Sequence, residues 1–217
     1  MLVQSLNIGR PCLENFFGKE YTTGICKQPV TSPLALTRTG FVGDGVADRK
    51  HHGGMDKAVC AYSLDHYPHW QEVLGHPMPA AAFGENLTLA GLVEPDLCIG
   101  DTFRIGTAVV QVSQPRQPCK TLAARYGRTD FVKEVVASGR TGWYFRVLEE
   151  GEVRIGDALT RIAEDPLRVT VAEANRIYHH DRRNPDALDR VLAVAALSDS
   201  WRESFVALRT KCLAPEG

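Results

Sequence analysis

One cysteine stands where its neighbours favour a reactive or metal-binding thiolate. Cys119 ends the run Gln-Pro-Arg-Gln-Pro-Cys of residues 114–119. Its prolines fix φ and remove backbone donors, so the apolar strand predicted over 108–113 must end in a rigid loop. Arg116 and Lys120 are cationic neighbours, which lower the pKa of a thiol, and a helix beginning at Lys120 would add the positive end of its dipole. The pattern predicts a thiolate that ligates a metal or attacks an electrophile; a buried structural cysteine is the alternative.

A second segment gathers cationic and titratable side chains around two glycines. Within nine positions the chain places Arg49, Lys50, His51, His52 and Lys57. Gly53 and Gly54 let the backbone approach a ligand and point its N–H groups at it, which suits a phosphate or another anion. The alternatives are a solvated loop and a divalent metal held by the histidine pair, although adjacent histidines rarely share one ion.

A third segment, Phe-Gly-Glu-Asn-Leu at residues 83–87, enters a predicted strand. The side chains of Glu85 and Asn86 could hydrogen-bond the edge of a heterocycle. An ordinary turn explains the same residues, so the segment alone does not decide between the two.

The composition excludes several classes of protein. The chain has 217 residues, 25 Lys and Arg against 26 Asp and Glu, and 44% hydrophobic residues. It is therefore not a disordered chain, and it lacks the basic excess of a general nucleic-acid binder. No apolar run is long enough to span a membrane, and residues 1–10 do not resemble a signal peptide. The six cysteines form no CxxC pair, so we expect reduced thiols and a cytoplasmic protein.

The elements that must position these groups are mostly strands. Short β-branched or aromatic runs bounded by turn residues predict strands over 21–27, 57–62, 86–89, 103–105, 108–113, 143–148 and 158–162. We expect helices after Ser63, where Pro68 bends or delays the start, and from Thr129 as N-cap to Ser138. Many short strands favour a closed or sandwiched β-architecture, so the fold class is mainly β with α.

The last fifty residues change character. Helix N-termini are predicted at Thr170, at Asn184-Pro185 and at Ser198, each followed by an apolar stripe of helical period. We place a boundary near Asp165-Pro166, which divides the chain into a domain of residues 1–165 and a three-helix module of residues 166–217. So small a module buries little core, and we expect it to dock on the first domain.

In this order, the three segments resemble the MOSC domain family, and within it the YiiM-type members. The resemblance rests on Gly43-Asp44 with His-Gly-Gly-Met-Asp-Lys at 52–57, on residues 83–87 and on residues 114–119; Gly-Arg-Thr-Gly-Trp at 139–143 and the terminal helices also fit. It implies a MOSC-type β-barrel domain that binds a molybdenum cofactor of the molybdopterin type. The family is also associated with pyridoxal phosphate binding.

The resemblance also implies roles for particular residues. Cys119 becomes the thiolate ligand to molybdenum, and Arg116 lies over an oxo group or the substrate. The second segment becomes the binding site of the cofactor phosphate, which Arg49, Lys50, His52 and Lys57 contact around Gly53 and Gly54. Glu85 and Asn86 pair with the donors and acceptors of the pterin ring.

The activity implied by the resemblance is reduction of N-hydroxylated base analogues, such as 6-N-hydroxylaminopurine, to amines. The sequence holds no GxGxxG fingerprint, P-loop or iron–sulfur spacing, so a separate flavin or iron–sulfur reductase must supply the electrons. We expect no nucleic-acid or membrane partner. The three helices could dock the donor, form a homodimer or wall off the pocket. A cofactor carrier without turnover, and a thiol enzyme with Cys119 as nucleophile and His52 as base, are the alternatives.

Overall fold

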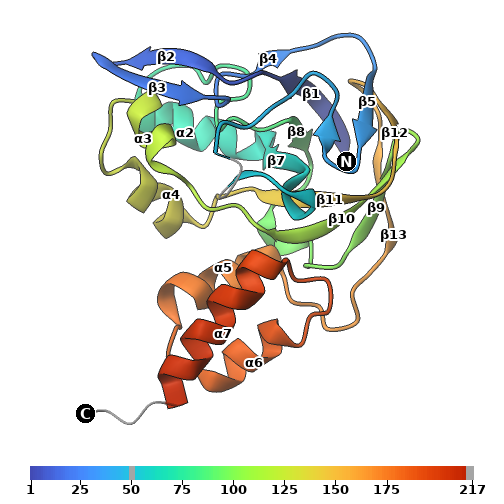
Figure 1. Cartoon of the computed structure of the whole chain (residues 1–217), viewed down its shortest axis with the longest axis vertical. Helices are drawn as coiled ribbons and strands as arrows, with labels where there is room; N and C mark the ends of the chain where they lie inside the picture. Colours follow the sequence, from blue (N-terminus) through green and yellow to red (C-terminus); the bar gives the residue numbers. More distant parts are fainter. Residues whose placement is uncertain (49–51, 214–217) are drawn as a thin grey trace.

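A curled sheet forms the body of the first domain in the computed structural model, which describes residues 1–48 and 52–213 (Figure 1). Within these residues the sheet has eight strands, in the order β13-β9-β10-β11-β7-β8-β1-β4. The strands are β1 (Leu2–Ile8), β4 (Gln28–Pro29), β7 (Val59–Ser63), β8 (Leu87–Ala90), β9 (Thr102–Ile105), β10 (Ala108–Pro115), β11 (Trp143–Glu149) and β13 (Leu159–Ala163). Only the β7–β8 pairing in this sheet is parallel.

Backbone hydrogen bonds bring the two ends of the sheet together. Val3 N donates to Asp157 O and Leu159 N donates to Met1 O, both at 3.0 Å, beside a bridge between Leu2 and Ala158. The sheet therefore curls around one apolar core, whose buried members include Leu6, Val59, Leu87, Phe103, Val110 and Phe145. The predicted barrel-like, mainly β fold is confirmed.

Two small sheets complete the first domain. One contains β12 (Gly151–Val153), β5 (Leu34–Thr37) and β6 (Gly40–Phe41), and the other is a hairpin of β2 (Cys12–Phe16) and β3 (Lys19–Thr23). The strand predicted over 21–27 ends early, at Thr23. The next residue, Gly24, passes so close to the backbone of Gly45 that a Cβ would lie 2.6 Å from its oxygen.

Short helices pack beside the sheet. They are η1 (Met55–Lys57), η2 (Leu64–His66), η3 (Glu94–Asp96), α2 (Tyr67–Leu74), α3 (Lys120–Arg125) and α4 (Phe131–Ser138). Pro68 lies in the first turn of α2, where proline is tolerated, and Gly139 ends α4 with φ of 70°. The N-cap predicted at Thr129 is wrong by one residue. Asp130 occupies that position, and its carboxylate accepts a hydrogen bond from Arg128 instead of capping the helix.

The C-terminal module consists of α5 (Val171–His180), α6 (Pro185–Leu192) and α7 (Asp199–Leu213), drawn at the bottom of Figure 1. The three predicted caps are present. Thr170 accepts from Glu173 N at 3.0 Å, Asn184 from Ala187 N at 3.1 Å and Ser198 from Trp201 N at 3.3 Å. Each cap satisfies one of the backbone donors that a helix N-terminus leaves free.

The module docks on the first domain, as expected. Ile99 of the first domain belongs to the module's apolar core with Ile177, Leu188, Trp201 and Phe205. The backbone of Ile99 also donates to Val169 O at 2.9 Å. Among the described residues, the structure contains no helix whose length and apolar character would allow it to cross a membrane.

Candidate functional site

Cys119 lies at the point where the longest strand of the sheet turns into a helix. Strand β10 ends at Pro115 and α3 begins at Lys120, so the rigid loop predicted between them is present and Cys119 is the N-cap of α3. The side chain is partly buried and packs against the aromatic cluster that contains Phe83 and Tyr126. This placement differs from that of an inert core thiol, since one side of the sulfur faces polar groups.

The polar neighbours of Cys119 favour its thiolate. Burial by itself would raise the pKa of the thiol. A hydrogen bond from His52, the charge of Arg116 and the backbone N–H of Leu122 outweigh that effect and lower the pKa from its ordinary 9.0 to about 6. His52 and Arg116 come from different segments, so the site exists only in the folded chain.

Arg116 is buried, although it carries a charge. Its side chain is 5% exposed, Nη2 donates to Phe83 O at 2.6 Å, and the guanidinium carbon lies 6.0 Å from the centre of the Phe83 ring. Nη1 is buried too, and within the described residues it has no hydrogen-bond partner; the same holds for Nε2 of Gln117. Buried donors are almost always paired, so each of these two nitrogens is a candidate donor to an oxygen atom of a ligand.

A second thiol, that of Cys60, also interacts with the charge of Arg116. Cys60 is 7% exposed, and burial raises its pKa to about 11 although the charge of Arg116 opposes the change. Burial also raises the pKa of Tyr144, whose hydroxyl donates a hydrogen bond to the Cys60 sulfur. No sequence pattern singles out Gln117, Cys60 or Tyr144 as functional residues. The pairing of Tyr144 with Cys60 follows from the register of β11 on β7, which no local pattern shows.

One residue of the predicted anion-binding segment, His52, contacts the Cys119 thiol in the structure. His52 bonds to Cys119, and its backbone N–H donates to Asp48 O at 2.9 Å. Gly54, with φ of 101°, has no atom within 4 Å of where a Cβ would stand, so its backbone is open on that side. Gly53 is half-buried. Lys57 is half-buried as well, and burial lowers its pKa against the opposing charges of Asp56 and Asp48.

Phosphate binding by this segment stays a prediction. Arg49 and Lys50, two of the cations assigned to the phosphate, lie outside the described residues, as does His51.

Glu85 is completely buried, and both of its carboxylate oxygens are used within the protein. Oε1 accepts from the Tyr67 hydroxyl at 2.5 Å and from Thr88 Oγ1 at 2.9 Å, and Oε2 accepts from Phe83 N at 2.9 Å. The predicted pairing of Glu85 with a pterin ring therefore has no support in its contacts. Its contacts fix the turn that presents Phe83 O to Arg116.

Asn86 also makes internal hydrogen bonds. Its Oδ1 accepts from Cys60 N at 3.1 Å, and its Nδ2 donates to Asn7 O at 3.2 Å and to Asp44 Oδ2 at 2.7 Å. Asp44 in turn forms a buried ion pair with Lys27. Asn86 thus joins β1, β7 and the loop before His52, which is a positioning role. Its contact with the cofactor ring stays a prediction.

Within residues 1–48 and 52–213, no three His, Cys, Asp or Glu side chains are grouped so that they could hold a metal ion. The metal site suggested as an alternative for the histidine pair is not formed by the described residues. A metal at Cys119 would need ligands beyond those that the described residues supply.

Family comparisons agree with this geometry. The model of the MOSC domain matches residues 48–160, and that of the "YiiM-like, 3-alpha helix domain" matches residues 169–211. The chain belongs to the MOSC domain family. The MOSC match contains the segment of His52, the turn of Glu85 and the loop of Cys119, and the second match covers the three helices that dock beside them.

The chain is similar to two relatives and to one solved structure of a YiiM protein. An uncharacterized protein, YflK of Bacillus subtilis (strain 168), is 51% identical over 99% of this chain and 97% of its own. A protein of Gibberella moniliformis named "Reductase" is 34% identical over 74% of this chain but only 29% of its own. The crystal structure of YiiM from Geobacillus stearothermophilus is 40% identical, covers 96% of this chain and 98% of its own, and superposes with a TM-score of 0.83.

Proposed function

We propose that this MOSC protein is a molybdenum-cofactor-dependent reductase that converts N-hydroxylated compounds, among them N-hydroxylated base analogues, to amines. One observation carries the proposal. A thiol with a pKa of about 6 shares one loop with the buried donors Arg116 Nη1 and Gln117 Nε2, which have no partner among the described residues.

The described residues fit the proposed cofactor. Molybdenum held by a pterin dithiolene is a soft metal centre, and a thiolate is a soft ligand, so the lowered pKa of Cys119 suits ligation. The buried donors of Arg116 and Gln117 suit the oxygen atoms of an oxo group or of a substrate. When bound, the cofactor supplies two-electron oxygen-transfer chemistry that no amino-acid side chain offers.

In this proposal, residues of this chain hold the metal and donate hydrogen bonds to the substrate. Cys119 holds the metal, and Arg116 and Gln117 donate to the oxygen that leaves the substrate. His52 keeps the sulfur ionised through its hydrogen bond. The net reaction, R–NH–OH plus two electrons and two protons giving R–NH2 and water, breaks one N–O bond and consumes both protons in forming the N–H and O–H bonds.

The electrons must come from another protein. The sequence contains none of the cofactor fingerprints of a flavin, nicotinamide or iron–sulfur protein. We therefore propose a separate flavin or iron–sulfur reductase as partner. The name of the Gibberella relative supports redox chemistry. The match covers 29% of that chain, so the name describes a protein with much additional sequence.

The test is a reduction assay with a flavin-containing reductase as electron donor and 6-N-hydroxylaminopurine as substrate. Protein from a host that makes the molybdenum cofactor should form the amine, and Cys119→Ser should lose at least 99% of the rate. Cys26→Ser is the matched control, because Cys26 packs in the same aromatic cluster but its pKa is raised by burial. Amine formation by Cys119→Ser at the wild-type rate would refute the proposal.

A thiol enzyme is the second candidate, favoured by the hydrogen bond between His52 and Cys119. That pair resembles an activated nucleophile, which needs no metal. Turnover of an electrophilic substrate by metal-free protein, with a covalent adduct on Cys119, would favour this candidate. A protein that binds the cofactor but turns nothing over with any reductase would instead be a carrier.

A further inference from the structure

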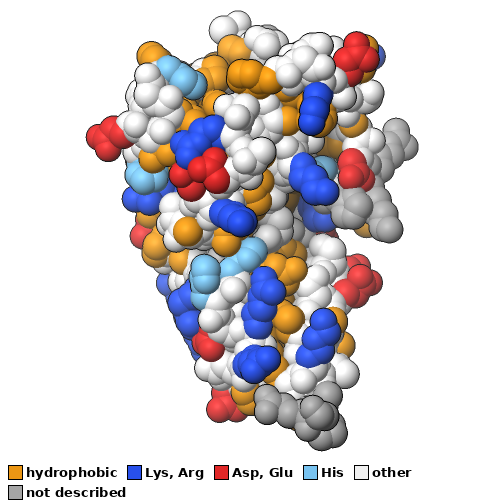
Figure 2. Space-filling model, turned by 90° about the vertical axis from the view of Figure 1, so that its left-hand side faces the viewer, with side chains coloured by type: hydrophobic (Ala, Val, Ile, Leu, Met, Phe, Trp, Pro, Cys, Tyr) orange, Lys and Arg blue, Asp and Glu red, His pale blue; other side chains and the backbone are white. Residues whose placement is uncertain are grey.

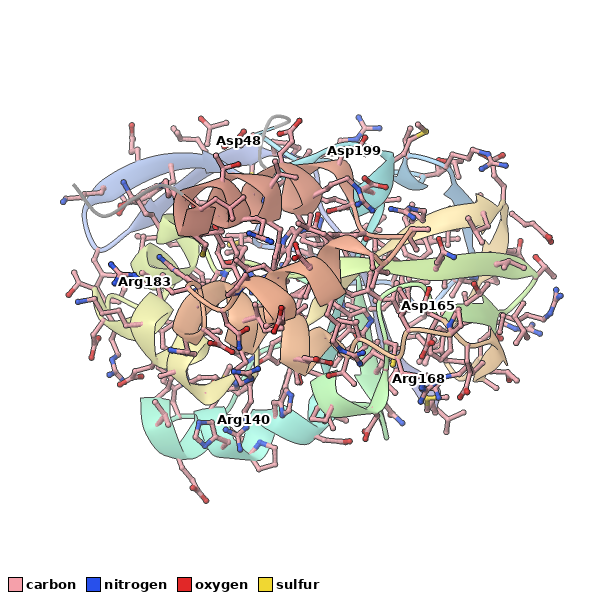
Figure 3. The ribbon with its side chains drawn as sticks, turned by 90° about the horizontal axis from the view of Figure 1, so that it is seen from below. Asp48, Arg140, Asp165, Arg168, Arg183 and Asp199 are labelled. Carbon is pink, nitrogen blue, oxygen red and sulfur yellow. The ribbon has the colours of Figure 1, made fainter. Side chains whose placement is uncertain are left out.

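Two free thiols that the proposed function does not use lie at the base of the β2–β3 hairpin. Cys12 is the first residue of β2 and is paired across the hairpin with Thr23, the last residue of β3. Cys26 follows Thr23 by three residues. Figure 1 and Figure 3 both show the blue hairpin at the edge of the first domain. The chain therefore returns past Cys12 shortly before it reaches Cys26.

The two thiols share one carboxylate. Cys12 Sγ donates to Glu14 Oε1 at 3.2 Å, and the Cys26 thiol also donates a hydrogen bond to the Glu14 side chain. Burial contributes most to the raised pKa of Cys26, the charge of Arg125 opposes it, and the charges of Glu14 and of an ionised Cys12 add to it. Such charge effects fall off with distance, so Glu14 gathers both sulfurs in one place.

The two sulfurs differ in exposure. Cys12 is exposed, whereas Cys26 is partly buried against the aromatic cluster that contains Phe83 and Tyr126. A reagent in solution therefore meets Cys12 first. Cys26 lies behind it, where it can react with an adduct that has formed on Cys12. An exposed cysteine with a second cysteine beside it is the arrangement of an attacking and a resolving thiol.

The hairpin between these thiols is attached to the domain at its two ends. Its strands form a two-stranded sheet of their own, and an isolated hairpin is marginally stable in water. At the tip, the Phe17 ring lies so close to Gly127 that a Cβ there would stand 2.7 Å from it. At the base, Gly24 touches the backbone of Gly45. A covalent link at the base would therefore restrain the whole hairpin.

We propose that Cys12 and Cys26 are a modification site, at which a low-molecular-weight disulfide oxidises the two thiols to a reversible disulfide that fastens the hairpin. The reaction uses neither Cys119 nor a cofactor. The proposal is therefore independent of the reductase function proposed above.

The reaction consists of two thiol–disulfide exchanges. Ionised Cys12 attacks one sulfur of the oxidant RSSR, which forms a mixed disulfide between Cys12 and R–S and releases RS⁻. Ionised Cys26 then attacks the Cys12 sulfur, which forms the bond between the two cysteines and releases the second RS⁻. The two RS⁻ take up the two protons that the cysteines lost. Two protein thiols are thus oxidised, one RSSR is reduced to two RSH, and a dithiol reductant reverses the change.

The test treats the full chain with oxidised glutathione at pH 8, using protein from cells that make no molybdenum cofactor. Free thiols are then alkylated, and the protein is digested with trypsin. Trypsin does not cleave between Arg10 and the proline that follows it, so the two cysteines fall in the peptides of residues 1–19 and 20–27. Cys119 falls in the peptide of residues 117–120, so its own reaction with glutathione is read separately.

We expect the peptides of residues 1–19 and 20–27 to be joined after this treatment. The amount of free 20–27 peptide should fall about tenfold, and dithiothreitol should restore it. Cys212→Ser is the matched control, because Cys212 is another partly exposed thiol, whose sulfur donates to the backbone oxygen of Arg182 in the C-terminal module. This variant should form the link as the wild type does.

Two further variants separate the roles of the thiols. Cys26→Ser removes the resolving thiol, so the reaction should stop at the mixed disulfide and glutathione should remain on Cys12. Cys12→Ser removes the exposed thiol, and Cys26 should then stay largely reduced because it is partly buried. Retention of glutathione on Cys12 in the first variant, together with its loss in the wild type, identifies Cys26 as the resolving residue.

Hydrogen exchange measures whether the disulfide fastens the hairpin. The backbone amides of β2 and β3 should exchange about tenfold more slowly in the oxidised protein than in the reduced protein, because the link restricts local opening. Cys26→Ser that carries glutathione on Cys12 controls for the effect of an adduct alone, and its hairpin should exchange as in the reduced wild type.

Two results would overturn the proposal. One is wild-type protein that keeps glutathione on Cys12, or joins Cys12 to a second copy of the chain, without linking Cys12 to Cys26. The other is a linked protein whose hairpin amides exchange as fast as those of the reduced protein. Neither measurement involves molybdenum or amine formation, so failure of this proposal and failure of the proposed function are distinguishable.

Discussion

Cys119 and Cys60 are two thiols that share one arginine but have opposite pKa shifts. Burial raises the pKa of both, and Arg116 lowers both. Around Cys60 the carboxylates of Glu85 and Asp44 add to the effect of burial, whereas Cys119 receives hydrogen bonds from His52 and from the backbone of Leu122 that lower its pKa. A cationic neighbour alone therefore does not make a thiolate in this protein; burial and the other groups around the sulfur decide its pKa as well.

The first prediction concerns the reactivity of Cys119. Its alkylation by iodoacetamide should be half-maximal near pH 6 and should fall below that pH, because protonation removes the nucleophilic form. His52→Ala removes a hydrogen bond to the thiolate and should move the midpoint upward by at least one pH unit. Peptide mass spectrometry provides the measurement, with Cys26 in the same samples as internal control, since burial raises its pKa. A midpoint above pH 8 in the wild type would contradict the described site.

The second prediction follows by linkage. The pKa of Cys119 is lower in the folded chain, about 6, than its ordinary 9.0, so ionisation stabilises the fold. This stabilisation is fully present above pH 9 and is lost as the pH falls through about 6. The free energy of unfolding of the wild type relative to Cys119→Ser should therefore increase from pH 6 to pH 9 in urea titrations. A constant difference over this range would show that the folded state leaves the thiol unshifted.

At the residue scale, the sequence alone predicted the site residues that lie close together along the chain. Cys119 and Arg116 lie in one proline-bounded run, and the prolines alone predict a stiff loop. Gln117 lies in the same run, but its significance is a buried amide nitrogen without a partner, which only coordinates can show. Glu85 and Asn86 have the residue types of a ligand-binding pair, and their internal hydrogen bonds depend on strands that are distant in the sequence.

At the scale of elements, the Asn86 side chain hydrogen-bonds three segments near the site, namely β1, β7 and the loop of Asp44. Replacing it with alanine leaves the buried Cys60 N and Asp44 Oδ2 without this partner, and we expect a loss of about 3 kcal/mol in the free energy of unfolding. Urea titration measures the loss. Asn15→Ala is the control, because Asn15 caps only the exposed Gly18 N and should cost less than about 1 kcal/mol. Equal losses in the two variants would contradict the structural role of Asn86.

Elements were predictable where the side chains alternate or where turn residues bound them. Strands β7 to β11 and β13 carry apolar runs, glycine directly follows β8 and β9, and the helix caps at Thr170 and Asn184 are local signals. Strand β1 was missed because Leu2–Ile8 mixes apolar residues with polar ones. Its Asn7 is completely buried and donates to Thr88 on β8, a partner 81 residues away.

At the scale of the whole molecule, the module packs against the end of β10 and against η1, which lie beside the segments of the candidate site. The sequence predicted that the module docks, because its three short helices bury too little core alone. It did not predict where, since the contacts of Ser198, Asp199 and Asn175 depend on how the first domain folds. Figure 2 shows Lys and Arg side chains spread over the module, and several pair with acids, such as Arg190 with Glu173 and Arg209 with Asp189.

The charged side chains on the module suggest how the proposed electron donor would approach the protein. The ion pairs of the module are exposed, so they add little to stability and are available to exchange partners. We predict that the rate of reduction by the donor falls with ionic strength, because an encounter steered by surface charge is screened by salt. Steady-state rates between 20 and 300 mM NaCl, at saturating substrate and limiting donor, measure this effect. Rates that do not depend on salt would exclude electrostatic steering.

The central claim is that the Cys119 sulfur holds molybdenum in a pterin cofactor, and metal analysis tests it most directly. Wild type, Cys119→Ser and Cys26→Ser are purified from a host that makes the cofactor, and molybdenum and pterin are measured per chain. We expect molybdenum and pterin in equal amounts in the wild type and in Cys26→Ser, and at least a tenfold loss of molybdenum in Cys119→Ser. Folded wild-type protein without molybdenum, or a Cys119→Ser protein that retains all of it, would contradict the account.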